Sequence, residues 1–237
     1  MQEDFDDNAQ PWYSQRSNLK YVLFEYGVIN IGEDTFYNEY ASIVNVRIGN
    51  SVEYIGVWAF GYCYSLRTVT IGNSVEYICF KAFGYCNSLT TVTIPNSVTL
   101  IEYEAFYSCT SLTTITIPNS ITSIEDKTFY SCTSLTTITI PHSVTSIRSS
   151  AFSSCTSLTT ITIGNSVTSI GDYAFSSCSS LTNFYFYGTK EPSYDGIYVF
   201  SGCSSLKTIY VPTTYSDDDE TKFCGYSFEI KKELTPM

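Results

Sequence analysis

Residues 105–124 read AFYSCTSLTTITIPNSITSI, and versions of this segment recur through most of the chain. Phenylalanine marks a step of 23 residues at Phe60, Phe83, Phe106, Phe129, Phe152 and Phe175, and Phe200 follows after 25. A cysteine comes three residues after each of them, at Cys63, Cys86, Cys109, Cys132, Cys155, Cys178 and Cys203. A leucine keeps the same step, at Leu66, Leu89, Leu112, Leu135, Leu158, Leu181 and Leu206. Such an unbroken period predicts one elongated array of repeats.

Within one repeat, the five residues after the leucine alternate in character. After Leu112 they are Thr-Thr-Ile-Thr-Ile, with β-branched residues at every position, which is the pattern of a strand. Pro118 follows, and the same place is taken in other repeats by Pro95, Pro141, Pro212, Gly49, Gly72 and Gly164. Since proline cannot donate to a strand ladder, it ends the strand at a fixed point. The apolar residues of the second half fit neither a helix nor a strand, so we expect irregular or short 3₁₀ structure there.

A period of 20–29 residues that carries L-x-x-I-x-I is typical of a leucine-rich-repeat solenoid. The sequence therefore predicts an α/β horseshoe, a right-handed solenoid of about nine repeats with short parallel strands on its concave face and irregular or 3₁₀ segments on its convex face. We place the solenoid at residues 19–215, an acidic N-terminal cap at 1–18 and a C-terminal cap at 216–237. Apolar residues in both terminal segments are expected to cover the ends of the array, and they are Phe5, Trp12, Phe223 and Phe228.

The nine cysteines favour a buried, reduced ladder over a disulfide framework. Seven of them keep one register position beside the apolar phenylalanine and leucine, where a free cysteine packs as a small apolar side chain. Cys79 and Cys224 lie off this register and are expected to be exposed, and the sequence leaves open whether they are free or paired. The chain contains neither Cys-x-x-Cys nor a His/Cys pair at zinc spacing, so no metal site and no cofactor are expected.

Charge and hydropathy limit the classes of partner. The net charge is −11 and no stripe of Lys or Arg is present, which disfavours nucleic acid and anionic membranes. The acidic N-terminus lacks the apolar core of a signal peptide, and no run of 18 apolar residues exists that would insert into a membrane. These features favour an intracellular or a non-classically exported protein.

Two features that could suggest chemistry have simpler interpretations. His142 is the only histidine, and it replaces the turn asparagine of the neighbouring repeats with no acid or nucleophile at a recognisable spacing. We interpret it as a turn residue. The acidic run 217–220 lacks the spacing of a calcium loop, and we interpret it as a solvated tail. The sequence therefore predicts a protein that is not an enzyme.

The motif Leu-x-x-Ile-x-Ile-Pro-x-Ser-Val-x-x-Ile-x-x-x-Ala-Phe-x-x-Cys resembles the BspA-like, Treponema-type class of leucine-rich repeats. The repeats from Leu112 to Cys132 and from Leu158 to Cys178 match it with almost no departures. The segments around Phe184, Tyr210 and Phe223 resemble the closing region of members from parasitic protists. The resemblance implies a cell-surface or secreted protein that binds extracellular matrix, host cells or other microbes.

Strand periodicity also predicts which residues face outward from the concave side. These candidate binding residues are Asn45, Arg47, Thr68, Thr70, Thr91, Thr93, Thr114, Thr116, Thr137, Thr139, Thr160, Thr162, Tyr185, Thr208 and Tyr210. In one interpretation threonine is simply a good strand residue that forms cross-strand pairs and keeps the face soluble. In another, the neutral face contacts a protein or a glycan, with specificity at the tyrosine end. Ice binding is a third interpretation, which the curvature of a horseshoe disfavours.

Two hypotheses about function follow. The first is a non-enzymatic binding or adhesion module that recognises a protein or glycan partner through the concave sheet and its Tyr185 and Tyr210 end. The second is an intracellular structural or scaffold protein that self-associates end to end. The location is left open, because the resemblance implies the surface and the absent signal peptide implies the interior.

Overall fold

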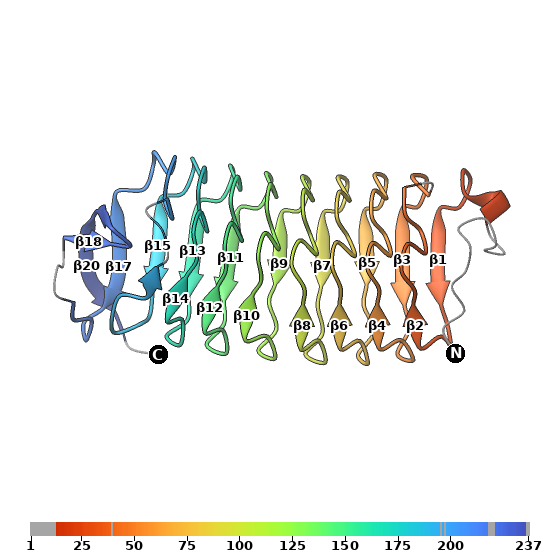
Figure 1. Ribbon diagram of the computed structural model, residues 1–237, viewed down its shortest axis with the longest axis horizontal. Helices are drawn as coiled ribbons and strands as arrows, with labels where there is room; N and C mark the ends of the chain where they lie inside the picture. Colours follow the sequence, from red (N-terminus) through yellow and green to blue (C-terminus); the bar gives the residue numbers. More distant parts are fainter. Residues whose placement is uncertain (1–12, 39, 195, 197, 218–220, 236–237) are drawn as a thin grey trace.

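The computed structural model describes residues 13–38, 40–194, 196, 198–217 and 221–235. The chain coils repeatedly, and successive coils lie side by side along the long axis of the molecule (Figure 1). Each complete coil contributes one longer and one shorter strand, and strands of a kind pair in parallel with those of the next coil. The predicted parallel-strand solenoid of about nine turns is confirmed.

The longer strands form what we call the front ladder. Its central strands alternate between exposed threonine and buried valine or isoleucine, as the sequence pattern predicts. The ladder consists of β1 (Tyr21–Phe24), β3 (Asn45–Ile48), β5 (Thr68–Thr70), β7 (Thr91–Thr93), β9 (Thr114–Thr116), β11 (Thr137–Ile140), β13 (Thr160–Ile163), β15 (Asn183–Phe186), β17 (Thr208–Pro212) and β20 (Glu229–Leu234).

A second set of parallel strands, the back ladder, forms where irregular or 3₁₀ segments were expected. Its strands have two residues each, and they are β2 (Asn30–Ile31), β4 (Tyr54–Ile55), β6 (Tyr77–Ile78), β8 (Leu100–Ile101), β10 (Ser123–Ile124), β12 (Ser146–Ile147), β14 (Ser169–Ile170) and β16 (Ser193–Tyr194). Among the described residues the one 3₁₀ helix is η1 (Tyr13–Gln15), which precedes the array. The sequence did not reveal the back ladder, because a two-residue strand is too short to produce a visible period.

Regular pairing is interrupted once in each ladder, at the same height in the stack. The front ladder divides between β9 and β11, and the back ladder divides between β8 and β10. The coils on either side remain neighbours (Figure 1), and the Thr136 N–H still donates to the Thr113 carbonyl at 3.2 Å. The core therefore continues across the interruption.

Left-handed backbone turns connect the back ladder to the front. Two residues per coil have positive φ, as at Lys81 (50°) and Tyr85 (60°), although a non-glycine residue there is strained. Hydrogen bonds between coils offset this cost. The Trp58 N–H, for example, donates to the Phe80 carbonyl of the next coil at 3.0 Å, and the Tyr62 N–H donates to the Gly84 carbonyl at 2.9 Å. The turns are thus held by the neighbouring coil.

The core consists of the repeat residues stacked in register. Phenylalanine rings of adjacent coils stack nearly parallel, with centroids 5.4 Å apart for Phe60 and Phe83 and 5.6 Å apart for Phe152 and Phe175. All seven register cysteines are free and buried, which confirms the reduced ladder. Each thiol also donates to the carbonyl of a phenylalanine in the preceding coil, as Cys132 does to Phe106 at 3.3 Å. Cysteine therefore fills space and also bonds one coil to the next.

The two off-register cysteines differ from expectation. Cys79 is 1% exposed and Cys224 is fully buried, and both are free. Cys79 lies directly after the back-ladder strand β6, a strand that the sequence did not reveal, so its inward position was not foreseen. Cys224 has a positive φ of 49° in the turn between β18 (Lys222–Phe223) and β19 (Tyr226–Ser227).

The last described segment packs on the final coil. Phe223 is fully buried and its ring contacts Phe186 and Phe200, while Phe228 contacts Phe200 with centroids 5.4 Å apart. Strand β20 pairs in parallel with β17 and extends the front ladder beyond the last recognisable repeat. Phe5 and Trp12, which were expected to cover the other end, lie outside the described residues.

Candidate functional site

The predicted binding residues lie together on the outer side of the front ladder, and we call this surface the threonine face. Register pairing places Thr68 beside Thr91 and Thr91 beside Thr114, and the same threonine positions recur in β11 and β13. Every predicted residue is exposed or half-buried, while the isoleucines and valines between them are buried. The strand alternation thus brings all fifteen candidate residues to one surface.

Hydrogen bonding differs between neighbouring rows of threonines. Where a threonine directly follows the repeat leucine, its hydroxyl donates to the preceding coil, as the Thr113 hydroxyl does to the Thr90 carbonyl at 3.2 Å. The hydroxyls of the central face, such as Thr91 and Thr116, form no hydrogen bond with another residue in the part of the chain that the structure describes. The cross-strand hydroxyl pairs that we expected are therefore missing there. These donors and acceptors face solvent and are available to a partner.

The C-terminal end of the threonine face is aromatic and charged. The rings of Tyr185 and Tyr210 lie 5.0 Å apart between centroids. Strand β20 adds Glu229 beside Thr208 and Lys231 beside Tyr210, and the Lys231 Nζ lies 5.9 Å from the Tyr210 ring centroid. Sequence reasoning missed this last strand because the repeat pattern is lost after Val211 and residues 229–234, Glu-Ile-Lys-Lys-Glu-Leu, do not alternate as a strand does.

The N-terminal end of the same face is apolar. Tyr21 pairs with Asn45 and Leu23 pairs with Arg47, and these two side chains are 72% and 54% exposed. Both were absent from the predicted site. The threonines were selected as the second and fourth residues after the repeat leucine. Tyr21 and Leu23 hold the same positions after Leu19, so the same rule would have selected them.

The back of the first coils carries an aromatic surface that the sequence analysis did not identify as a site. Tyr54, Tyr77 and Leu100 point outward from the back ladder and are 39%, 37% and 36% exposed. Other rings on the adjoining turns contact one another in a continuous network. We call these residues the aromatic patch: Tyr37, Tyr54, Trp58, Tyr62, Tyr64, Tyr77, Phe80, Tyr85, Leu100, Tyr103, Tyr107 and Tyr130.

A lysine lies inside this patch. The Lys81 Nζ is 4.5 Å from the Trp58 ring centroid and 5.1 Å from that of Phe80, and it forms a 3.0 Å ion pair with Glu104. Tyr54 lies nearby, and its pKa is raised to about 12. The causes are a hydrogen bond with the Cys79 thiol, partial burial and the negative charge of Glu102. The Tyr54 hydroxyl therefore stays protonated well above the pH at which a free tyrosine ionises.

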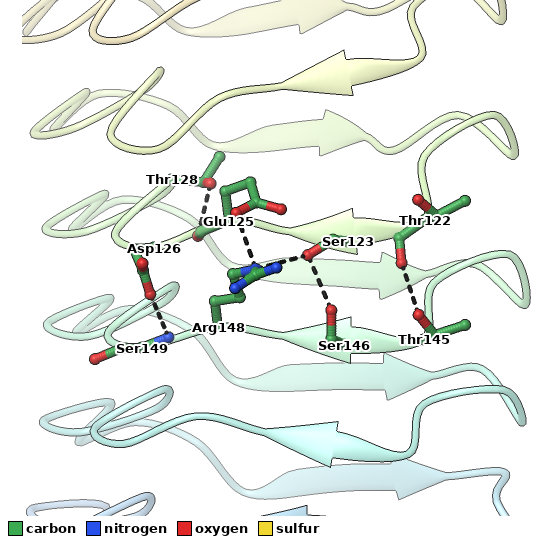
Figure 2. Close-up of polar contacts among 9 residues, drawn as sticks. All are labelled: Thr122, Ser123, Glu125, Asp126, Thr128, Thr145, Ser146, Arg148 and Ser149. Atoms are coloured by element: carbon green, nitrogen blue, oxygen red, sulfur yellow. Dashed lines mark hydrogen bonds and ion pairs between the residues drawn. The ribbon is translucent and has the colours of Figure 1, made fainter. Parts of the chain in front are cut away.

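The back of the later coils is polar and internally bonded (Figure 2). Serine replaces tyrosine on the back ladder, and the Ser146 hydroxyl donates to the Ser123 hydroxyl at 2.9 Å. Arg148 pairs with Glu125 at 2.9 Å, and the Ser149 N–H donates to the Asp126 carboxylate at 2.8 Å. Most polar groups on this part of the surface therefore have partners within the chain.

In the part of the chain that the structure describes, no group of three His, Cys, Asp or Glu residues is placed so that it could hold a metal ion. His142 Nδ1 lies 2.9 Å from the Oδ1 and 3.2 Å from the backbone nitrogen of Asn165 in the next coil, the same repeat position at which the Asn50 Oδ1 accepts from the Asn73 N–H at 2.9 Å. This contact confirms its interpretation as a turn residue. Of the acidic run, only Asp217 lies within the described residues. No described helix has the length and apolar character needed to cross a membrane.

The fold and these surfaces define a leucine-rich-repeat solenoid. The family description "BspA type Leucine rich repeat region (6 copies)" matches residues 10–113 and 99–231. The chain belongs to this family, as the repeat motif predicts. Leucine-rich-repeat proteins are typically protein-interaction modules. A search of curated proteins gives no match.

Solved structures agree with the family assignment. The chain is 28% identical to a leucine-rich-repeat protein of Treponema pallidum, with a TM-score of 0.58 over 79% of this chain and 78% of that one. A leucine-rich-repeat protein of Bacteroides ovatus is 24% identical, with a TM-score of 0.55 over 81% of this chain. The match spans 63% of the Bacteroides protein. A leucine-rich cell surface protein of Faecalibacterium prausnitzii is 24% identical, with a TM-score of 0.54 over 90% and 88% of the two chains.

Proposed function

We propose that this protein is a non-enzymatic binding module, used in adhesion, whose threonine face contacts a protein or a glycan. The observation that carries the proposal is the row of central threonine hydroxyls, which are exposed and form no hydrogen bond within the described chain. A solenoid presents such groups on a long preformed surface, so little ordering is needed on binding. The Faecalibacterium neighbour is described as a cell surface protein, which supports a role at the surface.

Specificity is assigned to the tyrosine end of the face. Tyrosine adds a large rigid contact area and a hydroxyl at low entropic cost, whereas the repeated threonines present the same two groups on every coil. Tyr185, Tyr210 and Lys231 are grouped on adjacent strands. We therefore expect a partner to be distinguished there and to extend along the threonines.

The test is to screen the protein on arrays of immobilised extracellular proteins and glycans and then to compare affinities for any ligand found. Replacing Tyr185→Ser together with Tyr210→Ser should weaken binding about tenfold or more, the loss of about 1.4 kcal/mol or more. The matched control is Tyr173→Ser with Tyr198→Ser, because these rings also stack, 4.9 Å apart, but lie on turns near the back ladder. Equal affinity of both variants and the unchanged protein would remove the site assignment.

Self-association is the second candidate, in a structural or scaffold role inside the cell. It is favoured by the first coil, where β1 is the terminal strand of its ladder and Tyr21, Leu23 and Tyr26 are 72%, 54% and 103% exposed. Among the described residues no strand pairs with the outer edge of β1, and such an edge with apolar neighbours is a template for pairing with another chain. Sedimentation over a concentration series tests it, and a monomer at every concentration would rule it out.

A further inference from the structure

We propose that the aromatic patch is a second interaction surface, which binds a segment of a protein partner rich in Lys or Arg. This goes beyond the proposed function, because it involves the opposite ladder and a partner of defined charge. Three properties of the patch support it: its exposed tyrosines, its own internal lysine, and its excess of carboxylates.

The patch exposes aromatic rings over several adjacent coils. Tyr54, Tyr77 and Tyr103 are 39%, 37% and 48% exposed. The Tyr54 and Tyr77 rings are 5.5 Å apart and tilted by 41°, so their faces are not closed against each other. The same strand position in the later coils is serine, and the fold is unchanged there. Folding therefore does not require these tyrosines.

Lys81 shows which chemistry this environment accepts. Its ammonium group lies within 6.0 Å of the ring centroids of Trp58, Phe80, Tyr85 and Tyr107 and pairs with the Glu104 carboxylate. An ammonium or guanidinium over such rings is attracted by the negative ring face, and more strongly when a carboxylate is also present. The chain thus fills one cation position of the patch with its own side chain.

Neighbouring positions offer the same groups without a cation. Glu53 and Glu76 are exposed and directly precede Tyr54 and Tyr77. Within the described residues neither carboxylate forms an ion pair, whereas Glu104 pairs with both Lys81 and Lys127. Glu102, which accepts a hydrogen bond from the Phe80 N–H at 2.6 Å, adds a third negative charge close to Tyr54. Two adjacent coils therefore each carry an exposed glutamate directly before an exposed tyrosine in the sequence.

Charge complementarity selects the occupant. An acidic aromatic surface repels acidic peptides and gains from the side chains of Lys and Arg, which combine a cation with an apolar stem. A neutral glycan would stack on the rings but would gain nothing from the carboxylates. A basic peptide segment fits both parts of the surface.

The experiment measures fluorescence anisotropy of a labelled peptide of alternating Arg and Gly with the whole chain at physiological ionic strength. Replacing Tyr54→Ser with Tyr77→Ser should weaken binding about tenfold, and serine is the residue that the later coils carry. Glu53→Gln with Glu76→Gln, which alters no packing, should weaken it about threefold or more. Circular dichroism and thermal melting check that each variant is folded.

The control is Glu233→Gln, compared with the single variant Glu76→Gln, because it makes the same change in net charge at an exposed position at the far end of the array. It should change the affinity by less than about twofold. An equal loss in this control would mean general attraction to an acidic protein and would overturn the proposal. A second result would also overturn the proposal: the chain binds a neutral oligosaccharide through the tyrosines and does not bind the Arg-Gly peptide. The patch would then be a glycan site.

Discussion

The coils of residues 43–111 and those of residues 112–180 have the same interior and different backs. In both regions the phenylalanine rings stack 5.4–5.6 Å apart and each cysteine thiol bonds the preceding coil. The back ladder of the first region exposes Tyr54, Tyr77 and Leu100, while that of the second carries serines. The repeat therefore specifies the core contacts that join one coil to the next, and it leaves the residues of the back surface free to vary.

The largest expected effect concerns the shared interior at alkaline pH. Burial raises the pKa of Cys109, in the first region, and of Cys155, in the second, to about 12. Thiols of the unfolded chain ionise at about pH 8.5. Above that pH and up to about 12, the folded state holds more protons than the unfolded state, so the free energy of unfolding falls as pH rises. Each such thiol contributes about 1.4 kcal/mol per pH unit.

Urea unfolding at pH 7 and at pH 10 measures this loss. Cys109→Ala and Cys155→Ala should each reduce the difference between the two pH values, and by similar amounts, because the two thiols have the same surroundings. A pH dependence that neither variant changes would contradict the burial of these thiols. A change in one variant alone would contradict the equivalence of the two regions.

Phenylalanine truncation should produce the next largest effect. Phe83→Ala and Phe152→Ala each remove a fully buried ring from the stack, which should lower the free energy of unfolding by about 3–5 kcal/mol. The losses should agree within about 1 kcal/mol, since both rings stack on two neighbours. Denaturation followed by circular dichroism provides the values. A much smaller loss in one region would show that its coils collapse around the cavity.

The shared interior is also the part that could be predicted from the sequence. The period, the front-ladder strands and the buried register cysteines follow from residues that recur at fixed positions. The threonine face followed too, since strand alternation sets which side chains point outward. Its role in binding stays a prediction, as do the limits of the two caps.

The back could not be predicted, for reasons of geometry. A two-residue strand has no period to detect, and the left-handed turns occur at residues as different as Lys127 and Ser131. Some rings of the aromatic patch share a repeat position, as Tyr62 and Tyr85 do, and others come from different positions. Tyr85 lies one residue before a register cysteine and Tyr107 lies two before, yet their centroids are 5.2 Å apart. Only the path of the turns brings such positions together, so in the sequence they resemble ordinary surface variation.

The smallest expected effects on stability come from removing one cationic side chain from the back surface of each region. Lys81 is 18% exposed and its partner Glu104 is 15% exposed, whereas Arg148 is 54% exposed and Glu125 is 22% exposed. Lys81→Met keeps the apolar stem and removes the charge from among the rings, which should cost about 1–2 kcal/mol. Arg148→Met should cost at most about 0.5 kcal/mol, because solvent screens an exposed pair. Thermal unfolding of the two variants at low and high salt measures both quantities.

Salt separates the two contributions further. The Arg148 effect should disappear at high salt, since ions screen exposed charges. Most of the Lys81 effect should persist, because the ammonium contacts ring faces that salt does not reach. Equal and equally salt-sensitive losses would mean that the rings around Lys81 add nothing to its ion pair. In that case the aromatic patch would lose the feature that identifies it as a surface for cations.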